Sequence, residues 1–378
     1  AGVRTQDAYL SVSGGFALNV QANTRLLERY GFRGLLTPAC ANDSGVALGL
    51  GLLGLWTTGA LDTADLRITT AYQGNDLHPA ETDEALTAFA PFIEDITDFH
   101  PATFAEDLTD SVLVWADGPA EMGPRALGHR SLLGDPRSEK VKDLLNDYKQ
   151  RQWWRPVAPI VLTEHTGDWF EQDRPSPYML EAARVRPEAK DRIPAVLHLD
   201  GTARHQTLSA PDNPLLYRAI QAFHEATGVP IVCNTSLNDK GEPIADTAAQ
   251  CLNFAVRKGI RTVYLAGRRI RLHAPGTTGA VPPSAPHPRA TAFFAGQEAD
   301  RDALWQSWLD RGHTEAGLLL LTGTPQLLAD PATWTPNRVR LLAERIASQD
   351  PAFAENLAQF RRDHGPGTAF GDAPALRH

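Results

Sequence analysis

Cysteine is scarce in this sequence. Only three of the 378 residues are cysteines: Cys40, Cys233 and Cys251. Three widely spaced thiols cannot supply the paired framework that stabilises small secreted domains, and they cannot form a zinc site made of cysteine ligands. The sequence therefore predicts buried free thiols in a reducing compartment.

Long hydrophobic runs are also absent. The longest apolar stretch, Gly45–Trp56, is shorter than the ~18 residues that a membrane-spanning helix needs. The N-terminal residues show no basic segment followed by an apolar one, which is the pattern of a secretion signal. We expect a cytoplasmic protein that does not interact with a membrane.

Several catalytic and metal-binding signatures are missing. The twelve histidines include no HExxH and no HxxxH spacing, so we do not expect a histidine-based metal site within this chain. The GxSxG motif of hydrolases and the Walker A motif of P-loop enzymes do not occur either. We expect His129, His198 and His205 to be structural.

The overall charge is acidic. The net charge is -9 and the isoelectric point is near 5.7, which argues against broad nucleic-acid binding. A hydrophobic content of 42% and a charged content of 21% are typical of soluble globular proteins. The length allows two or three domains.

One stretch has the opposite charge. Between Met122 and Arg155, eight basic residues stand against four acidic ones, a local balance of +4. Most Arg and Lys residues at its two ends flank Gly, Pro or aromatic residues, whereas on a solvated helix face they would alternate with Glu. The stretch therefore predicts an anion site.

The expected strands and helices alternate along most of the chain, which indicates an α/β fold. Strands are expected at 8–12, 34–38, 111–116, 158–162, 195–199, 229–233 and 262–266. Helices are expected at 16–30, 45–56, 81–92, 138–148, 214–227 and 245–258. The small residues of the second helix predict close packing inside a domain.

Polar side chains stand just before or after several of these strands. Arginine suits an anion because its planar fork bonds two phosphate oxygens and keeps its charge. The turn Asn234–Asn238 supplies hydroxyl and amide groups that can hold a phosphate or a planar carbamoyl group. We expect these cations to converge on one polyanion: Arg125, Arg130, Lys149, Arg151, Arg155 and Arg204.

Other roles remain open for some of these residues. Arg125 and Arg130 would also suit a polar interface between domains. Asn234 and Ser236 would also suit a turn without any ligand. We expect the pair Trp153–Trp154 to belong to the core and not to stack on a base.

The N-terminal segment offers a second place for an anion. A strand, the Gly14-Gly15 turn and a helix put backbone N–H groups where they can face an anion. Such glycine pairs are common in ordinary tight turns, so the signal is weak. Asp43, within Asn42–Ser44, fits the N-cap of the helix expected at 45–56.

The sequence resembles a known family at several motifs that occur in the right order. These motifs make it similar to the C-terminal part of the O-carbamoyltransferases, which include enzymes of nodulation-factor and antibiotic tailoring. The N-terminal motifs resemble the end of that family's first domain, and the resemblance runs from about residue 8 to 270. The matching segments are 13–19, 42–49, 122–131, 155–159, 200–204, 234–238 and 241–244.

The resemblance implies an enzyme with two centres. The C-terminal domain would be YrdC-like, an α/β domain with a twisted mixed sheet, and it would form carbamoyl-adenylate from carbamoyl phosphate and ATP. The first domain, similar to the actin-like ATPase fold, would bind this adenylate with a divalent metal, typically iron. The carbamoyl group would pass there to the hydroxyl of a small-molecule acceptor, and Mg²⁺ would accompany the ATP.

The resemblance also implies roles for individual residues. Asp43 would be a metal ligand from the end of the first domain. Gly14, Gly15 and Asn19 would contact the nucleotide in that domain. The remaining positions would hold carbamoyl phosphate and the nucleotide phosphates: Lys149, Arg155, Arg204, Ser236 and Asn238, with Arg125, Arg130, Arg151 and Asn234 beside them.

The sequence departs from the family pattern in three ways. The family's first domain is much longer and gives the metal an HxxxH pair and a second acid, which this chain lacks. We therefore expect weak or no metal binding by this chain alone, and either a truncation or a separate chain that completes the site. His129 replaces the usual Asn, and Lys240 stands where Arg is common.

The expected organisation has four parts. Residues 1–70 would be a partial actin-like lobe, 71–107 a connecting region and 108–272 the YrdC-like domain. Residues 273–378 would be a linker, at 274–289, and a mostly helical extension with helices near 298–310 and 335–348. Two other functions are open: a threonylcarbamoyl-adenylate synthase of tRNA modification, and a nucleotide-binding partner subunit without catalysis.

Overall fold

The computed structural model describes residues 4–60, 70–152, 154–240 and 242–283. These ranges belong to one compact unit that spans residues 1–287. The end of the expected linker, residues 284–289, and both helices expected after it lie outside the described residues, as do Trp153 and Gly241.

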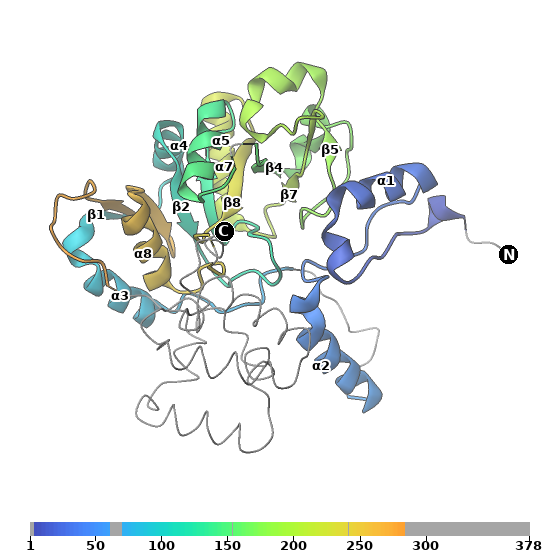
Figure 1. The fold of residues 1–378 in the computed structure, drawn as a ribbon, viewed down its shortest axis with the longest axis horizontal. Helices are drawn as coiled ribbons and strands as arrows, with labels where there is room; N and C mark the ends of the chain where they lie inside the picture. The colour runs from blue at the N-terminus through green and yellow to red at the C-terminus, as the bar shows by residue number, and fades with distance from the viewer. Residues whose placement is uncertain (1–3, 61–69, 153, 241, 284–378) are drawn as a thin grey trace, which may run out of the picture. The chain divides into compact units, whose positions relative to one another are not determined.

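An eight-stranded mixed sheet organises the described chain, which is therefore α/β as expected (Figure 1). β2 is parallel to β9 and β4 is parallel to β7, whereas the other neighbours are antiparallel. A separate ribbon pairs β5 (Ala183–Arg184) with β6 (Thr202–Ala203). The strand order is β1 (Ile93–Asp98), β10 (Arg268–Leu272), β9 (Thr262–Leu265), β2 (Leu113–Ala116), β3 (Arg130–Gly134), β8 (Ile231–Ser236), β4 (Ala158–Leu162) and β7 (Gln206–Leu208).

The inner strands are buried along their whole length. Every residue of β2, β3 and β4 is buried, and the sequences of β2 and β4 are continuous runs of apolar residues. Strands covered on both faces have this composition, because neither face contacts water. β1, at the edge of the sheet, is mostly exposed and carries charged residues, which discourage pairing with another chain.

Helices cover the sheet in two groups. α4 (Pro101–Asp110) packs on α7 (Pro214–Thr227), and α5 (Glu139–Tyr148) contacts β3. α3 (Pro79–Ala88) packs on α8 (Ala248–Lys258), and α8 in turn contacts β2 and β9. A short helix, α6 (Thr166–Trp169), follows β4.

Helices α7 and α8 have clear local signals at their ends. The side chain of Asn213 caps α7 by accepting from the Leu216 amide at 3.0 Å, and α7 ends at Gly228 with φ 74°. Thr247 and Gln250 form a reciprocal capping box at the start of α8. These signals explain why the helix expected at 214–227 is found with those bounds.

The N-terminal segment has little regular structure besides α1 (Val20–Tyr30) and α2 (Val46–Thr57). The strands expected at 8–12 and 34–38 reduce to one isolated bridge between Leu10 and Leu35. The side chain of Asn23 donates to the Leu180 carbonyl at 2.9 Å, so α1 is joined to the loop before β5.

α2 differs from the expectation of close packing. None of its residues is buried, although the helix is largely apolar, and Leu50 and Trp56 are 63% and 55% exposed. The expected N-cap at Asp43 is also wrong, because Asp43 begins a short 3₁₀ helix, Asp43–Gly45, and the cap of α2 is Gly45 without a side-chain hydrogen bond.

Two further expectations need correction. Residues 195–199 do not form a strand, because Pro194 starts a 3₁₀ turn, Pro194–Val196, and cannot donate to a ladder. Residues 71–107, expected to connect two domains, instead contribute α3, β1 and most of α4 to the sheet unit. The polar sequence of β1, IEDITD, lacks the apolar run of a buried strand.

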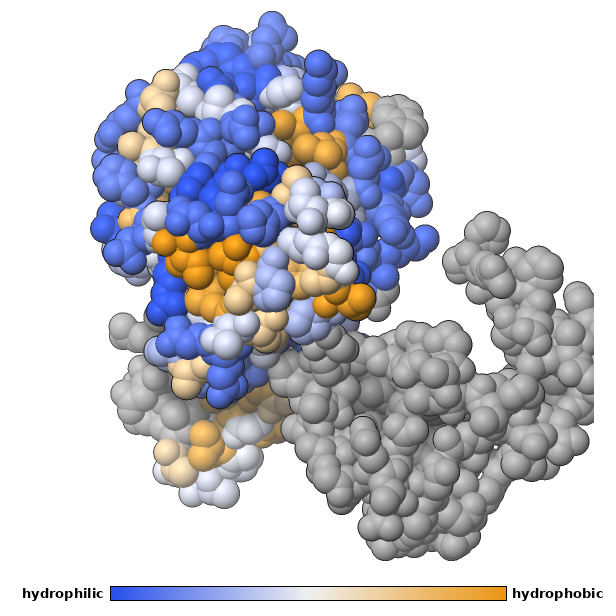
Figure 2. Space-filling view, turned by 90° about the vertical axis from the view of Figure 1, so that its left-hand side faces the viewer, coloured by the Kyte–Doolittle hydropathy of each residue, from blue (hydrophilic) through white to orange (hydrophobic). Residues whose placement is uncertain are grey.

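Hydrophobic residues are visible in several places on one face of the protein. Figure 2 shows them among hydrophilic residues, with a conspicuous group near the middle of that face. Within the described ranges, no helix has both the length and the apolar composition to cross a membrane.

The guanidinium group of Arg130 is fully buried at the start of β3. It donates to the carbonyls of Asn75, Asp117, Gly118, His129 and Asp246 at 2.8–3.3 Å. All five of its N–H groups are used in this way. Arg130 therefore joins the chain around residue 75, the loop before β3 and the loop before α8.

Replacing Arg130 with Met should lower the free energy of unfolding by about 3–5 kcal/mol, because several buried carbonyls would lose their donor. Urea unfolding followed by circular dichroism measures this change. Arg268, which forms an exposed ion pair with Asp83 at 2.8 Å, is the matched control, and Arg268→Met should cost less than about 1 kcal/mol. Equal effects of the two changes would contradict the structural role.

His205 is 1% exposed, and neither of its ring nitrogens has a hydrogen-bond partner. Its ring stacks on Phe170 with a centroid separation of 5.0 Å. Burial, assisted by the charge of Arg174, lowers the pKa of His205 to about 4. The expectation of a structural histidine is thus consistent with its position.

His205 should make the fold sensitive to acid. Because its pKa is lower in the folded chain, the unfolded chain takes up a proton at higher pH. The stability that neutral His205 contributes is complete above about pH 6.5 and falls as the pH drops toward 4, by on the order of 3 kcal/mol. Unfolding free energies measured between pH 7 and 4 should show a smaller loss for His205→Phe than for the wild type. The same change at exposed His273 should leave the loss unaltered.

Candidate functional site

A cavity of about 360 Å³ lies where β8 ends. Five separate segments form its walls, and they include residues of β4 and β8. The lining residues are Pro124, Arg125, Ala126, Arg151, Trp154, Arg155, Pro156, Ala158, Met179, Arg204, Asn234, Thr235 and Ser236.

The loop before β3 that carries Arg125 is ordered by Glu121. One carboxylate oxygen of Glu121 accepts from the amides of Leu127, His129 and Arg130 at 2.7, 2.8 and 3.1 Å. Gly123 has φ 100°, and a Cβ atom there would lie 2.5 Å from the Ala39 carbonyl oxygen. The Met-Gly-Pro-Arg motif therefore requires glycine for both conformation and space.

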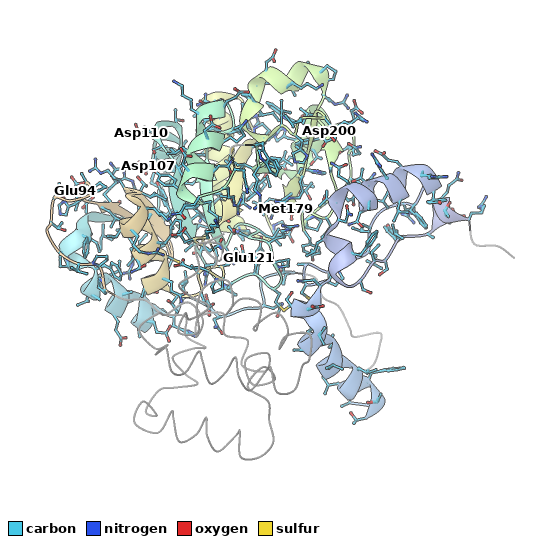
Figure 3. All side chains as sticks on the ribbon, viewed as in Figure 1. Glu94, Asp107, Asp110, Glu121, Met179 and Asp200 are labelled. Atoms are coloured by element: carbon cyan, nitrogen blue, oxygen red, sulfur yellow. The ribbon has the colours of Figure 1, made fainter. Side chains whose placement is uncertain are left out.

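The cavity is strongly cationic. Four arginines line it, and none of the lining residues in the described chain is acidic. Figure 3 shows Glu94, Asp107 and Asp110 on the side of β1 and α4, well apart from Met179. An anion that enters the cavity would therefore meet guanidinium groups without competing carboxylates.

Burial shapes the electrostatics of these arginines. It lowers the pKa of Arg204 to about 9, and the charges of Arg125 and Arg151 act in the same direction. The pKa values of Arg125 and Arg151 are lowered as well, mainly by burial. All three remain protonated at neutral pH, so the cavity brings together mutually repelling charges, and a bound anion would relieve this repulsion.

Several polar atoms at the cavity have no protein partner. The Nε atoms of Arg125 and Arg204 are buried and unpaired, and so is the side-chain oxygen of Asn234. The Asn234 amide group donates to the Ala126 carbonyl at 2.9 Å, while Arg151 donates to the Thr235 hydroxyl at 3.1 Å. Buried donors without partners are rare in folded proteins, so these atoms are candidates for contacts with a ligand.

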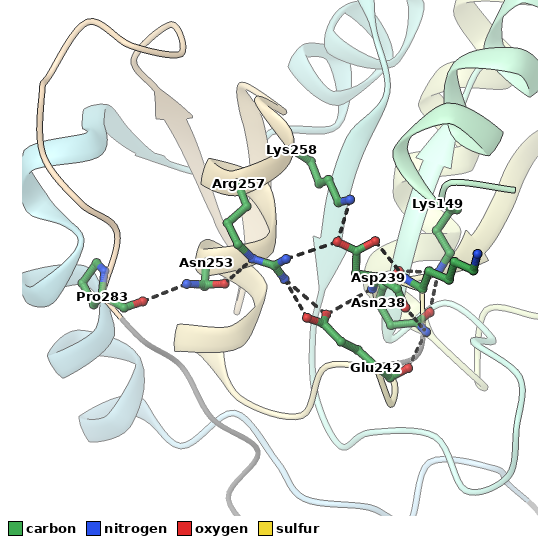
Figure 4. Close-up of polar contacts among 9 residues, drawn as sticks. Lys149, Asn238, Asp239, Glu242, Asn253, Arg257, Lys258 and Pro283 are labelled. Atoms are coloured by element: carbon green, nitrogen blue, oxygen red, sulfur yellow. Dashed lines mark hydrogen bonds and ion pairs between the residues drawn. The ribbon is translucent and has the colours of Figure 1, made fainter. Parts of the chain in front are cut away.

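Lys149 lies behind this lining. Its ammonium group, at the end of α5, donates to the Ser236 carbonyl at 2.6 Å, the Ser236 hydroxyl at 3.1 Å and the Asn238 carbonyl at 2.6 Å (Figure 4). The side-chain oxygen of Asn238 also accepts from it. Burial, followed by the charge of Arg151, lowers the pKa of Lys149 to about 7.

The structure brings most of the predicted cations together but separates two. Arg125, Arg151, Arg155 and Arg204 line the cavity, as do Asn234 and Ser236. Arg130 does not line the cavity, because its guanidinium group donates to backbone carbonyls. The predicted position of Arg130 beside the phosphates is therefore corrected. Lys149 and Asn238 reach the cavity only through Ser236, so direct contact with a phosphate stays a prediction.

Sequence reasoning did not name seven of the lining residues as site residues: Pro124, Ala126, Trp154, Pro156, Ala158, Met179 and Thr235. Trp154, expected in the core, is 54% exposed and stands beside Arg155 at the cavity. Thr235 was within the Asn234–Asn238 turn and could have been found by its neighbours. Met179 comes from a loop with no motif, so no sequence signal marks it.

A second, smaller cavity of about 230 Å³ has a different character. Tyr72, Tyr178, Pro175 and Pro177 contribute to its walls, and no Lys or Arg is among its described lining residues. Gln206 donates to the Leu127 carbonyl at 2.7 Å, whereas its buried side-chain oxygen has no partner. Met179 lines the first cavity and Leu127 lines the second, and both belong to one small hydrophobic cluster.

The N-terminal candidates lie apart from the cationic cavity's lining. Asn19 caps α1, since its side-chain oxygen accepts from the Ala22 amide at 3.1 Å. Gly14 has φ 77°, and a Cβ atom at Gly14 or Gly15 would meet open space. Contact of these three residues with a nucleotide stays a prediction.

Asp43 is exposed and stands alone as a metal candidate. Among the described residues, no group of three or more His, Cys, Asp or Glu side chains is placed to hold a metal ion. One carboxylate does not fit a divalent transition metal, which needs more ligands. The described residues therefore do not form the implied metal site by themselves.

Comparison with known proteins identifies the sheet unit. Residues 105–271 match the family model described as "Carbamoyltransferase C-terminus". These residues include all four arginines of the cationic cavity, Lys149 and the Asn234–Asn238 turn.

Three curated relatives are similar over about two thirds of the chain. The nodulation protein NolNO of Sinorhizobium fredii is 37% identical over 250 residues, which are 64% of this chain and 37% of the relative. The 3'-hydroxymethylcephem-O-carbamoyltransferase of Streptomyces clavuligerus is 37% identical over 258 residues, 68% of this chain and 47% of the relative. Nodulation protein U of Rhizobium tropici is 36% identical over 243 residues, 64% of this chain and 40% of the relative.

The chain thus spans less than half the length of these relatives. The family match covers the strands and helices that build the cationic cavity. Residues 105–271 therefore belong to the carbamoyltransferase C-terminal family.

Proposed function

We propose that this chain belongs to an O-carbamoyltransferase and contributes mainly the part that activates the carbamoyl group. Carbamoyl phosphate, ATP and one water would yield carbamoyl-adenylate, phosphate and pyrophosphate. The observation that carries the proposal is the cavity with four arginines and no acidic lining residue, within a segment of the carbamoyltransferase family.

The cavity suits a doubly charged acyl phosphate such as carbamoyl phosphate. Arg204 and Arg125 offer unpaired buried N–H groups, which would bond phosphate oxygens in the planar geometry that guanidinium groups favour. An entering anion would also relieve the repulsion among these charges. Fixed donors of this kind stabilise the charge that develops on a transferring group.

Ser236 and Asn234 would orient the carbamoyl end. The Asn234 amide is held by the Ala126 carbonyl, which leaves its oxygen free to accept from the N–H of a carbamoyl group. The Ser236 hydroxyl accepts a hydrogen bond from Lys149, and this contact restricts the rotation of the Ser236 side chain. Lys149 would contribute its charge from behind this residue.

The second cavity would hold the nucleoside of ATP. Its aromatic and proline walls suit a flat ring, and the free oxygen of Gln206 suits an exocyclic amine. Both cavities border the cluster of Leu127 and Met179, so phosphates in one and a base in the other would meet across it.

The other parts of the family resemblance extend this proposal. The sheet unit would be YrdC-like, and residues 1–70 would form part of an actin-like lobe in which Gly14, Gly15 and Asn19 contact the nucleotide. Asp43 would serve a metal such as iron only together with ligands from elsewhere, such as a separate chain. The acceptor would be a small molecule with a hydroxyl group, as the name of the cephem carbamoyltransferase indicates for that relative.

The protein should release pyrophosphate when incubated with ATP, Mg²⁺ and carbamoyl phosphate. Arg204→Ala should reduce this rate at least about 100-fold, because one buried charge-assisted contact to the reacting groups is lost. The release is measured with a coupled pyrophosphate assay, and Arg268→Ala on β10 is the control that should retain activity.

Two outcomes would point elsewhere. Pyrophosphate release that requires threonine and bicarbonate in place of carbamoyl phosphate would identify a threonylcarbamoyl-adenylate synthase. Nucleotide binding by calorimetry with no release from the folded protein would indicate a partner subunit without catalysis. Either result would overturn the proposal.

Anion binding should weaken as the pH rises through about 7. The pKa of Lys149 is lowered to about 7, so its ammonium group, which holds Ser236 and Asn238, loses its proton in that range. A bound anion favours the protonated form, and affinity for inorganic phosphate should fall several-fold between pH 6.5 and 8.5 once phosphate's own ionisation is included. Calorimetric titration across this range should show the trend for wild type and for Lys140→Met, an exposed control on the same helix. The fall in affinity should be absent in Lys149→Met. If Lys149→Met shows the same fall as the wild type, the role of Lys149 is contradicted.

A further inference from the structure

The loop after β8 is held from two sides. On one side, Lys149 bonds Ser236 and Asn238. On the other side lies the C-terminal end of α8, where Arg257 and Lys258 point toward the loop (Figure 4). Asp239 and Glu242, the acidic residues of this loop, lie between the two groups of cations.

Lys258 and Arg257 both contact Asp239. The Lys258 ammonium lies 2.6 Å from a carboxylate oxygen of Asp239, and Arg257 lies 3.2 Å from the same oxygen. The side chains of Lys258 and Asp239 are only 12% and 14% exposed. The pair is therefore better shielded from water than a typical surface ion pair, which contributes little.

Arg257 also reaches Glu242. Its second guanidinium nitrogen lies 3.1 and 3.2 Å from the two Glu242 oxygens, and its Nε donates to Asn253 at 2.7 Å. One planar group thus bridges two acids of the loop while a third contact fixes its direction. Lysine could not reproduce this geometry.

The loop closes on itself around these acids. The Asp239 amide donates to Glu242 at 3.2 Å, and the Asn238 side chain donates to the Glu242 carbonyl at 2.7 Å. Holding Asp239 and Glu242 therefore also holds Asn238, whose side-chain oxygen accepts from both Lys149 and the Ser236 hydroxyl. The chain of contacts ends at Ser236 in the cavity lining.

Ionisation of Asp239 fits this arrangement. Burial by itself would raise the pKa of Asp239, but hydrogen bonds from Lys258 and the Lys240 amide, with the charges of Lys258 and Arg257, lower it overall. The carboxylate is thus charged because α8 supplies cations. Arg257 and Lys258 lie in the last turn of α8, where cations interact favourably with the helix dipole. This interaction by itself would stabilise only α8.

We infer that Arg257 and Lys258 are positioning residues of the cationic cavity: through Asp239 and Glu242 they hold the loop that places Asn238 and Ser236 against Lys149. The inference rests on the proposed anion-binding function and adds α8 to the elements that build the site. Neither residue lines the cavity.

The test is a double-mutant cycle on the binding of inorganic phosphate, measured by calorimetry at pH 6.5. Lys258→Met and Asp239→Asn should each raise the dissociation constant about five- to tenfold, since each removes the shielded Lys258–Asp239 ion pair between the loop and α8. The dissociation constant of the double variant should be no higher than that of the single variant that binds phosphate less tightly, because both changes remove the same Lys258–Asp239 contact. Lys258→Arg, which keeps the charge, should recover most of the affinity.

Arg268→Met is the matched control, because it removes an arginine that forms an ion pair on another element of the same unit. It should leave phosphate binding unchanged, and thermal unfolding should confirm that all variants are folded.

The outcomes separate the inference from the proposed function. If the wild-type protein binds no phosphate, the anion site is wrong and the inference falls with it. If the wild type binds phosphate and Lys258→Met binds equally well, or if the two single changes add fully, the positioning role alone is wrong.

Discussion

Arg130 joins three parts of the chain through backbone carbonyls, and the cationic cavity depends on all of them. Its guanidinium holds the loop before β3, which carries Arg125, and the carbonyl of Asp246, which precedes α8. Its own carbonyl accepts from the Leu237 amide at 3.0 Å and so ties down the loop after β8. A buried cation without a carboxylate partner is stable here because carbonyl dipoles replace its hydration.

The cations of this region divide into two kinds by what surrounds them. Arg130 and Lys149 are saturated by protein oxygens and act as supports, whereas Arg125 and Arg204 keep unpaired nitrogens at the cavity. Basic side chains of this region therefore either support the loops or remain available to bind an anion. What decides between them is whether loop carbonyls lie within reach of the side chain, and this follows from the packing of β3 and β8.

Two acidic residues near the cavity stabilise its loops and do not compete with an anion for the arginines. Glu121 accepts three backbone amides of the loop before β3, and Asp239 is bound by cations of α8. Neither lines the cavity. The negative charges thus shape the loops from outside, while the interior stays available to an anion.

Local sequence signals were enough to predict the α/β class, the bounds of helices such as α7, and a group of arginines, four of which line one cavity. These features depend on local signals: an Asn cap and a Gly stop for α7, apolar runs for β4, and a charge balance of +4 in an acidic chain. The motifs also identified the segment that belongs to the carbamoyltransferase C-terminal family.

Only the tertiary structure decided which cations face the cavity and which elements complete the sheet. Short, polar β1 has no local signature, because its pairing with β10 comes from residues about 170 positions away along the chain. Arg130 reads like its neighbours in sequence and differs only in the carbonyls that surround it. Trp154 and Met179 join the site because distant segments fold beside them, and no residue pattern encodes that proximity.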